Sequence, residues 1–307
     1  MEWKPAIETA MQRIRPHVTR TPVLAFNGFG LGYPIQMKLE QMQHTGSFKA
    51  RGAFNTLLKG DVPAAGLVAA SGGNHGAAVA YAAAQLGHKA RIYVPEIAGP
   101  SKIALIRDQG ADLVVVPGAY ANALEQAQAY ERDTGAMQIH AYDAPGTLEG
   151  QGTVMLEWEE QGLDADTVLI AVGGGGLIGG ALAWLNGRRK VVAVEPEQAA
   201  TLHNALAHGP DTATDVSGVA ANALGARVIG RMCYDLAQSV GVQSVLVPDQ
   251  AIVTAQRALW REARQLVEPA GAAALSALIS GAYRPEPGER VAVLVCGANI
   301  APDPFTG

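Results

Sequence analysis

Short runs of apolar, mostly β-branched residues alternate with longer Ala- and Leu-rich segments along almost the whole chain. Runs that are apolar throughout and separated by helix-length segments are typical of parallel strands covered on both faces. They predict strands at residues 35–39, 67–70, 90–94, 113–116, 137–140, 168–172, 191–194, 245–247 and 291–295. The pattern therefore indicates an α/β protein.

The segments between these runs predict helices, and two of them begin after recognisable start signals. Residues 102–109 follow Pro100-Ser101, and residues 251–266 follow Pro248-Asp249. Nine strands are many for one small sheet, so we expect two open, twisted, mostly parallel sheets covered by helices. The predicted large domain comprises residues 1–60 with 146–307, and residues 61–145 form a small mobile domain.

Composition excludes several classes of protein. The chain has 307 residues, 49% of them hydrophobic, and a net charge of −5 without a basic stripe, which argues against nucleic-acid binding. It has no apolar run near the ~20 residues of a membrane span, so we expect no membrane partner and a cytoplasmic location. Cys233 and Cys296 lie far apart and in no metal-ligand spacing.

Lys49 follows Gly46-Ser47-Phe48 at the point where a helical pattern begins. A lysine held and partly desolvated there has a lowered pKa and can act as a nucleophile or base. On this stretch alone, a solvated lysine in the first turn of a helix explains the pattern equally well.

Ligands of doubly wound sheets bind at the carboxyl ends of strands, and three predicted strands end in unusual sequences. Ser71-Gly72-Gly73-Asn74-His75-Gly76 follows residues 67–70 and precedes a predicted helix at 77–86. Its amides and side chains suit a carboxylate or phenolate oxygen, although a glycine-rich turn with Asn74 capping the helix is the simpler alternative.

The other two strand ends are a tetraglycine loop and a cysteine. Gly173, Gly174, Gly175 and Gly176 precede Leu177 and an Ala-rich helix, an arrangement suited to a phosphate. The loop lacks the Lys-Ser/Thr ending of a P-loop, while a dinucleotide stays open because Glu195 follows about twenty residues later. Cys296 ends the last strand, where a small buried core residue is the common alternative.

Together these motifs resemble, in order and spacing, the pyridoxal-phosphate enzymes of fold type II, which have the tryptophan synthase β-like fold. The resemblance runs from Thr21-Pro22 to Asn299 and includes residues 150–153 and 267–271. Within that superfamily the chain looks most like the serine/threonine dehydratases (ammonia-lyases) and their relative serine racemase.

The resemblance implies a role for each motif with pyridoxal 5'-phosphate as the cofactor. Lys49 would form the Schiff base, Phe48 would pack beside the ring, and Asn74 would hydrogen-bond its phenolate. Gly173, Gly174, Gly175, Gly176 and Leu177 would hold the phosphate, and Cys296 would face the pyridine nitrogen. Ser71, Gly72, Asn74 and His75 lie where the family binds its amino-acid substrate.

Single positions within the motifs discriminate between activities of this family. Sulfhydrylases have threonine where this chain has His75, which argues against β-replacement. Serine racemase has a proton-donating serine where this chain has Gly72. We therefore expect β-elimination of water from L-threonine or L-serine, giving a 2-oxo acid and ammonia. Elimination from 3-hydroxyaspartate, phenylserine or diaminopropionate, serine racemisation, and a nucleotide-binding oxidoreductase stay open as alternatives.

The family's cation site and subunit arrangement give two further expectations. Many relatives bind a divalent cation, and Glu195 and the Ala199 carbonyl occupy two of the ligand positions, but Thr201 replaces the acidic ligand. Hard divalent ions prefer charged oxygens, so Thr201 makes a divalent cation there doubtful and suits a monovalent one better. The resemblance implies a cation of either kind at Glu195 and Ala199, or no site. It also implies a homodimer.

Overall fold

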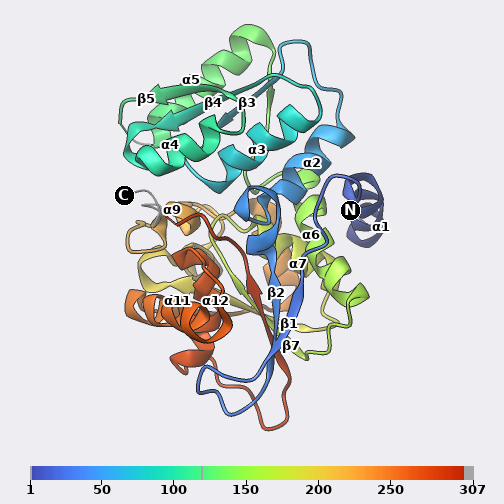
Figure 1. Ribbon diagram of the computed structural model, residues 1–307, viewed down its shortest axis with the longest axis vertical. Helices are drawn as coiled ribbons and strands as arrows, with labels where there is room; N and C mark the ends of the chain where they lie inside the picture. The colour runs from blue at the N-terminus through green and yellow to red at the C-terminus, as the bar shows by residue number, and fades with distance from the viewer. Residues whose placement is uncertain (1, 119, 301–307) are drawn as a thin grey trace.

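The computed structural model describes residues 2–118 and 120–300 and arranges them around two separate β-sheets (Figure 1). The larger sheet has the strand order β1-β2-β10-β7-β8-β9, and the smaller has the order β5-β4-β3-β6. All paired strands are parallel except β1, which runs antiparallel to β2. The strands are β1 (Val23–Phe26), β2 (Ile35–Leu39), β3 (Leu67–Ala70), β4 (Ala90–Pro95), β5 (Asp112–Val116), β6 (Met137–Gln138), β7 (Thr167–Ala171), β8 (Lys190–Pro196), β9 (Gln243–Val247) and β10 (Val291–Val295).

The predicted α/β class is confirmed, and each of the nine predicted strands is present. The strand predicted at residues 137–140 is shorter and ends at Gln138. The sequence-based prediction missed β1, whose residues are half-buried or exposed. An edge strand covered on one side does not need the continuous apolar run by which the other strands were found.

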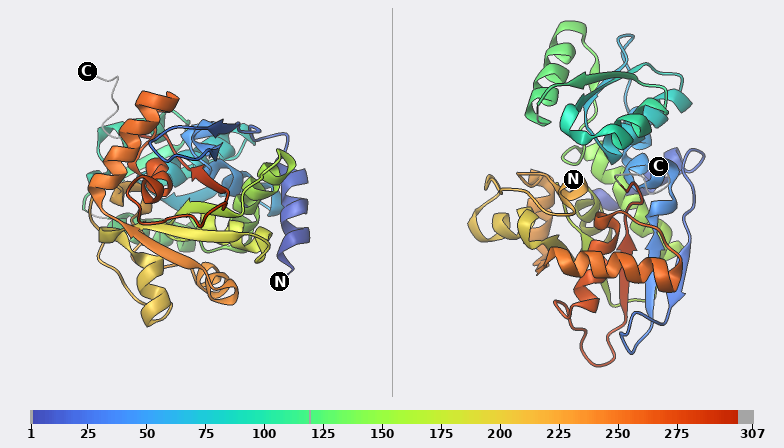
Figure 2. Two further views of the ribbon diagram at one scale, coloured as in Figure 1. Left: turned by 90° about the horizontal axis from the view of Figure 1, so that it is seen from below. Right: turned by 60° about the vertical axis from the view of Figure 1, so that its left-hand side comes forward.

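Twelve α-helices among the described residues cover the sheets (Figures 1 and 2). In the part of the chain built on the larger sheet, called here the larger unit, α12 packs on β7, β8, β9 and β10, whereas α7 packs on β7 and on α6. The smaller unit is the part built on the smaller sheet. The helices are α1 (Trp3–Ile14), α2 (Lys49–Lys59), α3 (Asn74–Gln85), α4 (Pro100–Arg107), α5 (Tyr120–Thr134), α6 (Pro145–Glu160), α7 (Gly176–Leu185), α8 (Thr201–His208), α9 (Ala221–Leu224), α10 (Arg231–Val240), α11 (Asp249–Ala263) and α12 (Pro269–Ile279). None of those described is long and apolar enough to cross a membrane.

Helix boundaries depart from the predictions for local reasons. Helix α4 begins at Pro100, which occupies its first turn, where the missing N–H of proline costs no hydrogen bond. Helix α11 ends at Ala263, three residues before its predicted end, because Arg264 adopts the left-handed conformation with φ of 56°.

Alternate residues of β3, in the smaller sheet, pack in two different hydrophobic clusters on the two faces of the sheet. Leu67 and Ala69 of β3 pack in the cluster that includes α3, whereas Val68 and Ala70 pack with buried alanines of α5. This is the period of two that a strand covered on both faces requires. The apolar face of α2 lies in the same cluster as Leu67, although the sequence groups that helix with the large domain. The proposed boundary near residue 60 stays a prediction.

Candidate active site

Lys49 stands where the end of the last strand meets the start of α2. Phe48, directly before it, donates its backbone N–H to the carbonyl oxygen of Cys296 at 3.2 Å. Ser47 forms an isolated antiparallel bridge with Gly297. Two sequence motifs almost 250 positions apart are therefore joined by main-chain contacts at the carboxyl end of β10.

The Lys49 amine is half-buried and has no ordinary solvated environment. Its Nζ donates to the carbonyl oxygen of Ala141 at 2.8 Å and lies 5.2 Å from the centroid of the Phe48 ring. Burial lowers the pKa of Lys49 to about 8, and the neighbouring Cys296 acts in the opposite direction. An amine with this pKa is partly unprotonated near neutral pH, so it can serve as a nucleophile or a base.

Asn74 is the first residue of α3, and its side chain turns towards the other unit rather than capping the helix. Its amide donates to Oε1 of Glu268 at 2.6 Å, and its Oδ1 accepts from Nδ2 of Asn299 at 2.8 Å. The residue before α3 is Gly73, which supplies no side-chain cap. The alternative in which Asn74 is a helix cap is therefore wrong, and Asn74 is held at the junction of the two units.

The rest of the Ser71–Gly76 turn is polar and uncharged. The Ser71 hydroxyl accepts from the N–H of Gly73 at 3.3 Å, and Nε2 of His75 lies 2.9 Å from the carbonyl oxygen of Ile139. Burial, assisted by the charge of Lys49, lowers the pKa of His75 to about 3. His75 is therefore neutral at physiological pH and can act as a hydrogen-bonding group.

Each glycine of the loop at 173–176 is closely packed. A Cβ on Gly174 would lie 2.3 Å from the Tyr142 ring, and one on Gly175 would lie 2.6 Å from Cys233. Gly175 also has φ of 94°, where side chains are strained, and it precedes the first turn of α7. The result is a close-packed loop opening a helix, where backbone amides favour an anion such as phosphate.

Cys296 and Glu268 are both buried at this junction. The Cys296 thiol donates to the carbonyl oxygen of Ala270 at 3.3 Å, and burial raises its pKa, so it is a neutral thiol. Burial also raises the pKa of Glu268 to about 7, while its hydrogen bond from Asn74 acts in the opposite direction. Lys49 thus has a neutral neighbour rather than a carboxylate partner.

The loop at 141–144 contacts several parts of this site, and the sequence analysis did not identify it. Ala141 accepts the Lys49 hydrogen bond, Tyr142 packs on Gly174 and Gly176, and the Asp143 carboxylate accepts two backbone N–H groups at the start of α10. This loop follows the strand predicted at 137–140. Applying the rule that ligand sites follow strand ends to this strand as well would have pointed to it.

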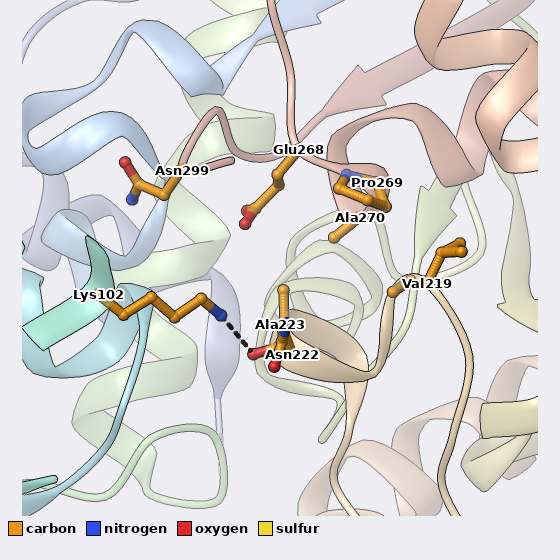
Figure 3. A pocket seen from close by; sticks show the side chains of 9 residues that line it. Lys102, Val219, Asn222, Ala223, Glu268, Pro269, Ala270 and Asn299 are labelled. Atoms are coloured by element: carbon orange, nitrogen blue, oxygen red, sulfur yellow. Dashed lines mark hydrogen bonds between the residues drawn. The ribbon is translucent and has the colours of Figure 1, made fainter. Parts of the chain in front are cut away.

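A small, partly open pocket lies between the two units near Asn74 (Figure 3). Lys102 reaches it from α4, whereas Glu268, Asn222 and Asn299 belong to the other unit. The other lining residues are Val219, Ala220, Ala223, Pro269 and Ala270. The sequence pattern places Lys102 in a helix but does not predict that its side chain lines this pocket.

The predicted cation ligands have other contacts. Both carboxylate oxygens of Glu195 accept backbone N–H groups, from Leu202 and His203 at 2.7 and 2.8 Å. Across residues 2–118 and 120–300, no group of three or more His, Cys, Asp or Glu side chains could hold a metal ion. A cation at Glu195 and Ala199 stays a prediction.

The residues present fit pyridoxal phosphate. A lysine amine with a lowered pKa, a fixed Asn74 amide, a helix-opening glycine loop and a neutral Cys296 thiol meet the needs of its aldehyde, phenolate, phosphate and ring. The buried hydroxyl of Ser47, two residues before Lys49, has no hydrogen-bond partner among the described residues. Buried hydroxyls rarely stay unpaired, so this one suits a polar ligand beside Lys49.

Comparison with known proteins supports the same conclusion. The chain is 34% identical over 301 residues to phenylserine dehydratase of Ralstonia pickettii, covering 96% of this chain and 92% of that protein. It is 33% identical to L-threonine ammonia-lyase of Geobacter sulfurreducens, covering 96% and 75%. The solved structure of maize serine racemase superposes with a TM-score of 0.90 at 30% identity, covering 97% and 93%.

The family model described as pyridoxal-phosphate dependent enzyme matches residues 14–297, which span both sheets and the site residues from Lys49 to Cys296. This chain therefore belongs to the pyridoxal-phosphate dependent enzymes of fold type II.

Proposed function

We propose that this protein removes water from L-threonine, L-serine or both by β-elimination. The released enamine tautomerises and is hydrolysed by water to a 2-oxo acid and ammonia. The observation that carries the proposal is the Lys49 amine, held 2.8 Å from the Ala141 carbonyl oxygen with its pKa lowered to about 8. Membership of the family and the similarity to an L-threonine ammonia-lyase support a lyase of this kind. The same membership removes the ground for a nucleotide-binding oxidoreductase.

In this mechanism the residues of the chain bind the substrate and move its protons. When bound, pyridoxal phosphate supplies an electron-withdrawing ring that acidifies the Cα–H bond of the amino acid. Lys49 removes the Cα proton as general base, since a freed amine with a lowered pKa is a competent acceptor. Ser71, Asn74 and His75 orient the carboxylate so that Cα faces Lys49. Cys296 would present the ring with a neutral thiol rather than a carboxylic acid, which favours elimination over a long-lived carbanion. The electrons of the Cα–H bond form the Cα=Cβ bond as the Cβ–O bond breaks, and the hydroxyl leaves as water with the proton that Lys49 removed.

The preferred substrate is tested separately from the reaction type. The relatives include a phenylserine dehydratase and a serine racemase as well as threonine ammonia-lyases. A coupled assay of ammonia and 2-oxo acid over L-threonine, L-serine, phenylserine, 3-hydroxyaspartate and diaminopropionate distinguishes them. We expect the highest kcat/KM for L-threonine or L-serine, and a clear preference for another member of the panel would contradict the proposal.

Serine racemisation is the second candidate, and Gly72 argues against it. Glycine has no proton to donate to the face of Cα opposite Lys49. A Cβ at this position would lie 2.5 Å from Cβ of Ala98, so a serine does not fit without a shift of that residue. Substitution of Gly72 alone should therefore lower stability, whereas Gly72→Ser with Ala98→Gly relieves the contact.

We expect the double variant to gain racemisation of L-serine, measured by chiral chromatography, while Ala98→Gly alone gains none. Rapid racemisation by the unmodified enzyme would overturn the argument from Gly72.

A homodimer and a cytoplasmic location stay predictions. Light scattering of the holoenzyme tests the homodimer.

A further inference from the structure

Lys102 is a buried lysine that crosses from one unit of the molecule to the other. It lies on α4 beside the smaller sheet, and only 4% of its surface is exposed. Its Nζ donates to the carbonyl oxygen of Asn222 in α9 at 3.3 Å (Figure 3). Burying an ammonium costs free energy, so this position needs a compensating interaction beyond one long bond to an uncharged carbonyl.

The ammonium also lies beside the turn that is expected to receive the substrate. A Cβ built on Gly73, in the middle of the Ser71–Gly76 turn, would lie 3.7 Å from Nζ of Lys102. In Figure 3 the side chains of Lys102 and Glu268 point into the same pocket, which Asn299 also lines. An ammonium has three N–H donors, so the bond to Asn222 leaves donors for a ligand in this space.

The charges around this pocket leave Lys102 as its source of positive potential. Of the described residues that line it, Lys102 alone is cationic. His75 is neutral because burial lowers its pKa to about 3, and Lys49 is committed to the chemistry at Cα. The Glu268 carboxyl offsets Lys102 only in part, since burial raises its pKa to about 7 and it is already bonded to Asn74.

We propose that Lys102 supplies the positive charge that binds the α-carboxylate of the amino-acid substrate, beside the uncharged donors of the Ser71–Gly76 turn. The inference rests on the proposed function, because it names how that site selects amino acids. Backbone amides and hydroxyls orient a carboxylate, but a charge-assisted hydrogen bond is about twice as strong as a neutral one. Lys102 is thus a specificity residue for the carboxylate, contributed by the smaller unit across the pocket.

The test compares two unreactive probes on the holoenzyme, glycine and glycinamide, which differ in the carboxylate. Binding is measured from the change in the cofactor absorbance. In Lys102→Met we expect the Kd for glycine to rise roughly 10-fold to 100-fold, as for loss of a hydrogen bond to a charged group. The Kd for glycinamide should change by no more than about twofold, since a neutral amide gains little from the ammonium.

Matched variants separate charge from packing. Lys89→Met removes an exposed lysine of the same unit and should alter neither Kd, whereas Lys102→Arg should keep most of the preference for glycine. If Lys102→Met fails to retain the cofactor, Lys102→Gln, which keeps a polar side chain without charge, replaces it. Equal losses for both probes, or no loss for glycine, would overturn the proposal.

The two probes lack a β-leaving group, so the result does not depend on elimination. A protein that binds glycine through Lys102 but eliminates water from no amino acid would keep this inference and refute the proposed function. A lyase whose Lys102→Met variant binds glycine normally would keep the proposed function and refute the role of Lys102.

Discussion

Lys49 and Arg51 lie two residues apart on α2, and burial affects their charges in opposite ways. Side chains with this spacing point to different faces of a helix. Lys49 faces a carbonyl oxygen and a neutral thiol, and burial lowers its pKa to about 8. Burial would also lower the pKa of Arg51, but the carboxylates of Glu40 and Glu157 outweigh it and raise that pKa.

The Arg51 guanidinium is fully buried and bonded to carboxylates on two sides. It donates to both oxygens of Glu40 at 2.8 Å and to those of Glu157 at 2.8 and 3.1 Å. Lys38 donates to the same Glu157 at 2.6 Å. The two neighbouring carboxylates thus outweigh burial at Arg51, and its guanidinium stays charged. One helix therefore joins a fixed charged cluster to an amine that can lose its proton.

The largest effect should come from removing the amine. In Lys49→Ala we expect loss of the yellow cofactor absorbance and of turnover, since this variant removes both the covalent link and the general base. The absorbance spectrum and the coupled ammonia assay measure the two losses separately. Borohydride reduction of the unmodified holoenzyme should fix the cofactor to the peptide that contains Lys49.

Lys59→Ala is the matched control, because it removes a lysine from the other end of the same helix, where the side chain pairs with Glu149 at 2.6 Å. It should keep the cofactor and its turnover. Turnover retained by Lys49→Ala would refute the assignment of this lysine.

Breaking the charged cluster should reduce stability rather than chemistry. Glu40→Gln leaves the buried Arg51 with one carboxylate partner instead of two and turns an amide towards its donors. Breaking a buried ion pair by removing one partner typically costs about 3–5 kcal/mol. The free energy of unfolding, measured by denaturant titration of the holoenzyme, should fall by that order.

Glu160→Gln provides the comparison, because it removes the partner of Arg15 in an exposed pair at 3.2 Å. Exposed ion pairs contribute up to about 1 kcal/mol, so the free energy of unfolding of Glu160→Gln should fall by no more than that. Similar losses in the two variants would mean that burial of the cluster does not matter.

The strands could be predicted from sequence because their signal is local. Residues 291–295 are apolar throughout, residues 35–39 alternate apolar with polar side chains, and both strands were placed to the residue. The rule that ligands bind at the carboxyl ends of strands then identified the Ser71–Gly76 turn, the glycine loop at 173–176 and Cys296 as candidate ligand sites. The half-exposed β1 carried no such signal.

The contacts of Lys49 and Asn74 were not predictable in the same way. The carbonyl of Ala141, which accepts from Lys49, has no side chain to distinguish it. Glu268 and Lys102 belong to segments whose hydrophobic pattern indicates only helices, and what brings them to Asn74 is the packing of two units. Sequence patterns indicate where strands end, whereas the approach of two units depends on tertiary contacts that no short motif encodes.

A smaller effect tests the lowered pKa itself. In the cofactor-free protein, acylation of Lys49 by a trace of amine reagent should rise with pH to a midpoint of about 8, because only the unprotonated amine reacts and burial lowers its pKa. Ordinary exposed lysines have a midpoint near 10.4. Mass spectrometry of the peptide containing Lys49 measures the labelled fraction, and a midpoint near 10 would contradict the burial argument.

Cys296→Asp extends this measurement by giving Lys49 the kind of partner that Arg51 has. A carboxylate in place of the neutral thiol favours the protonated amine, so the midpoint should move upward by about 1–3 units. Cys296→Ser is the neutral control and should leave the midpoint near its original value. An unchanged midpoint in the aspartate variant would mean that depth alone sets the pKa of Lys49. The two carboxylates beside Arg51 would then not explain why its pKa is raised while that of Lys49 is lowered.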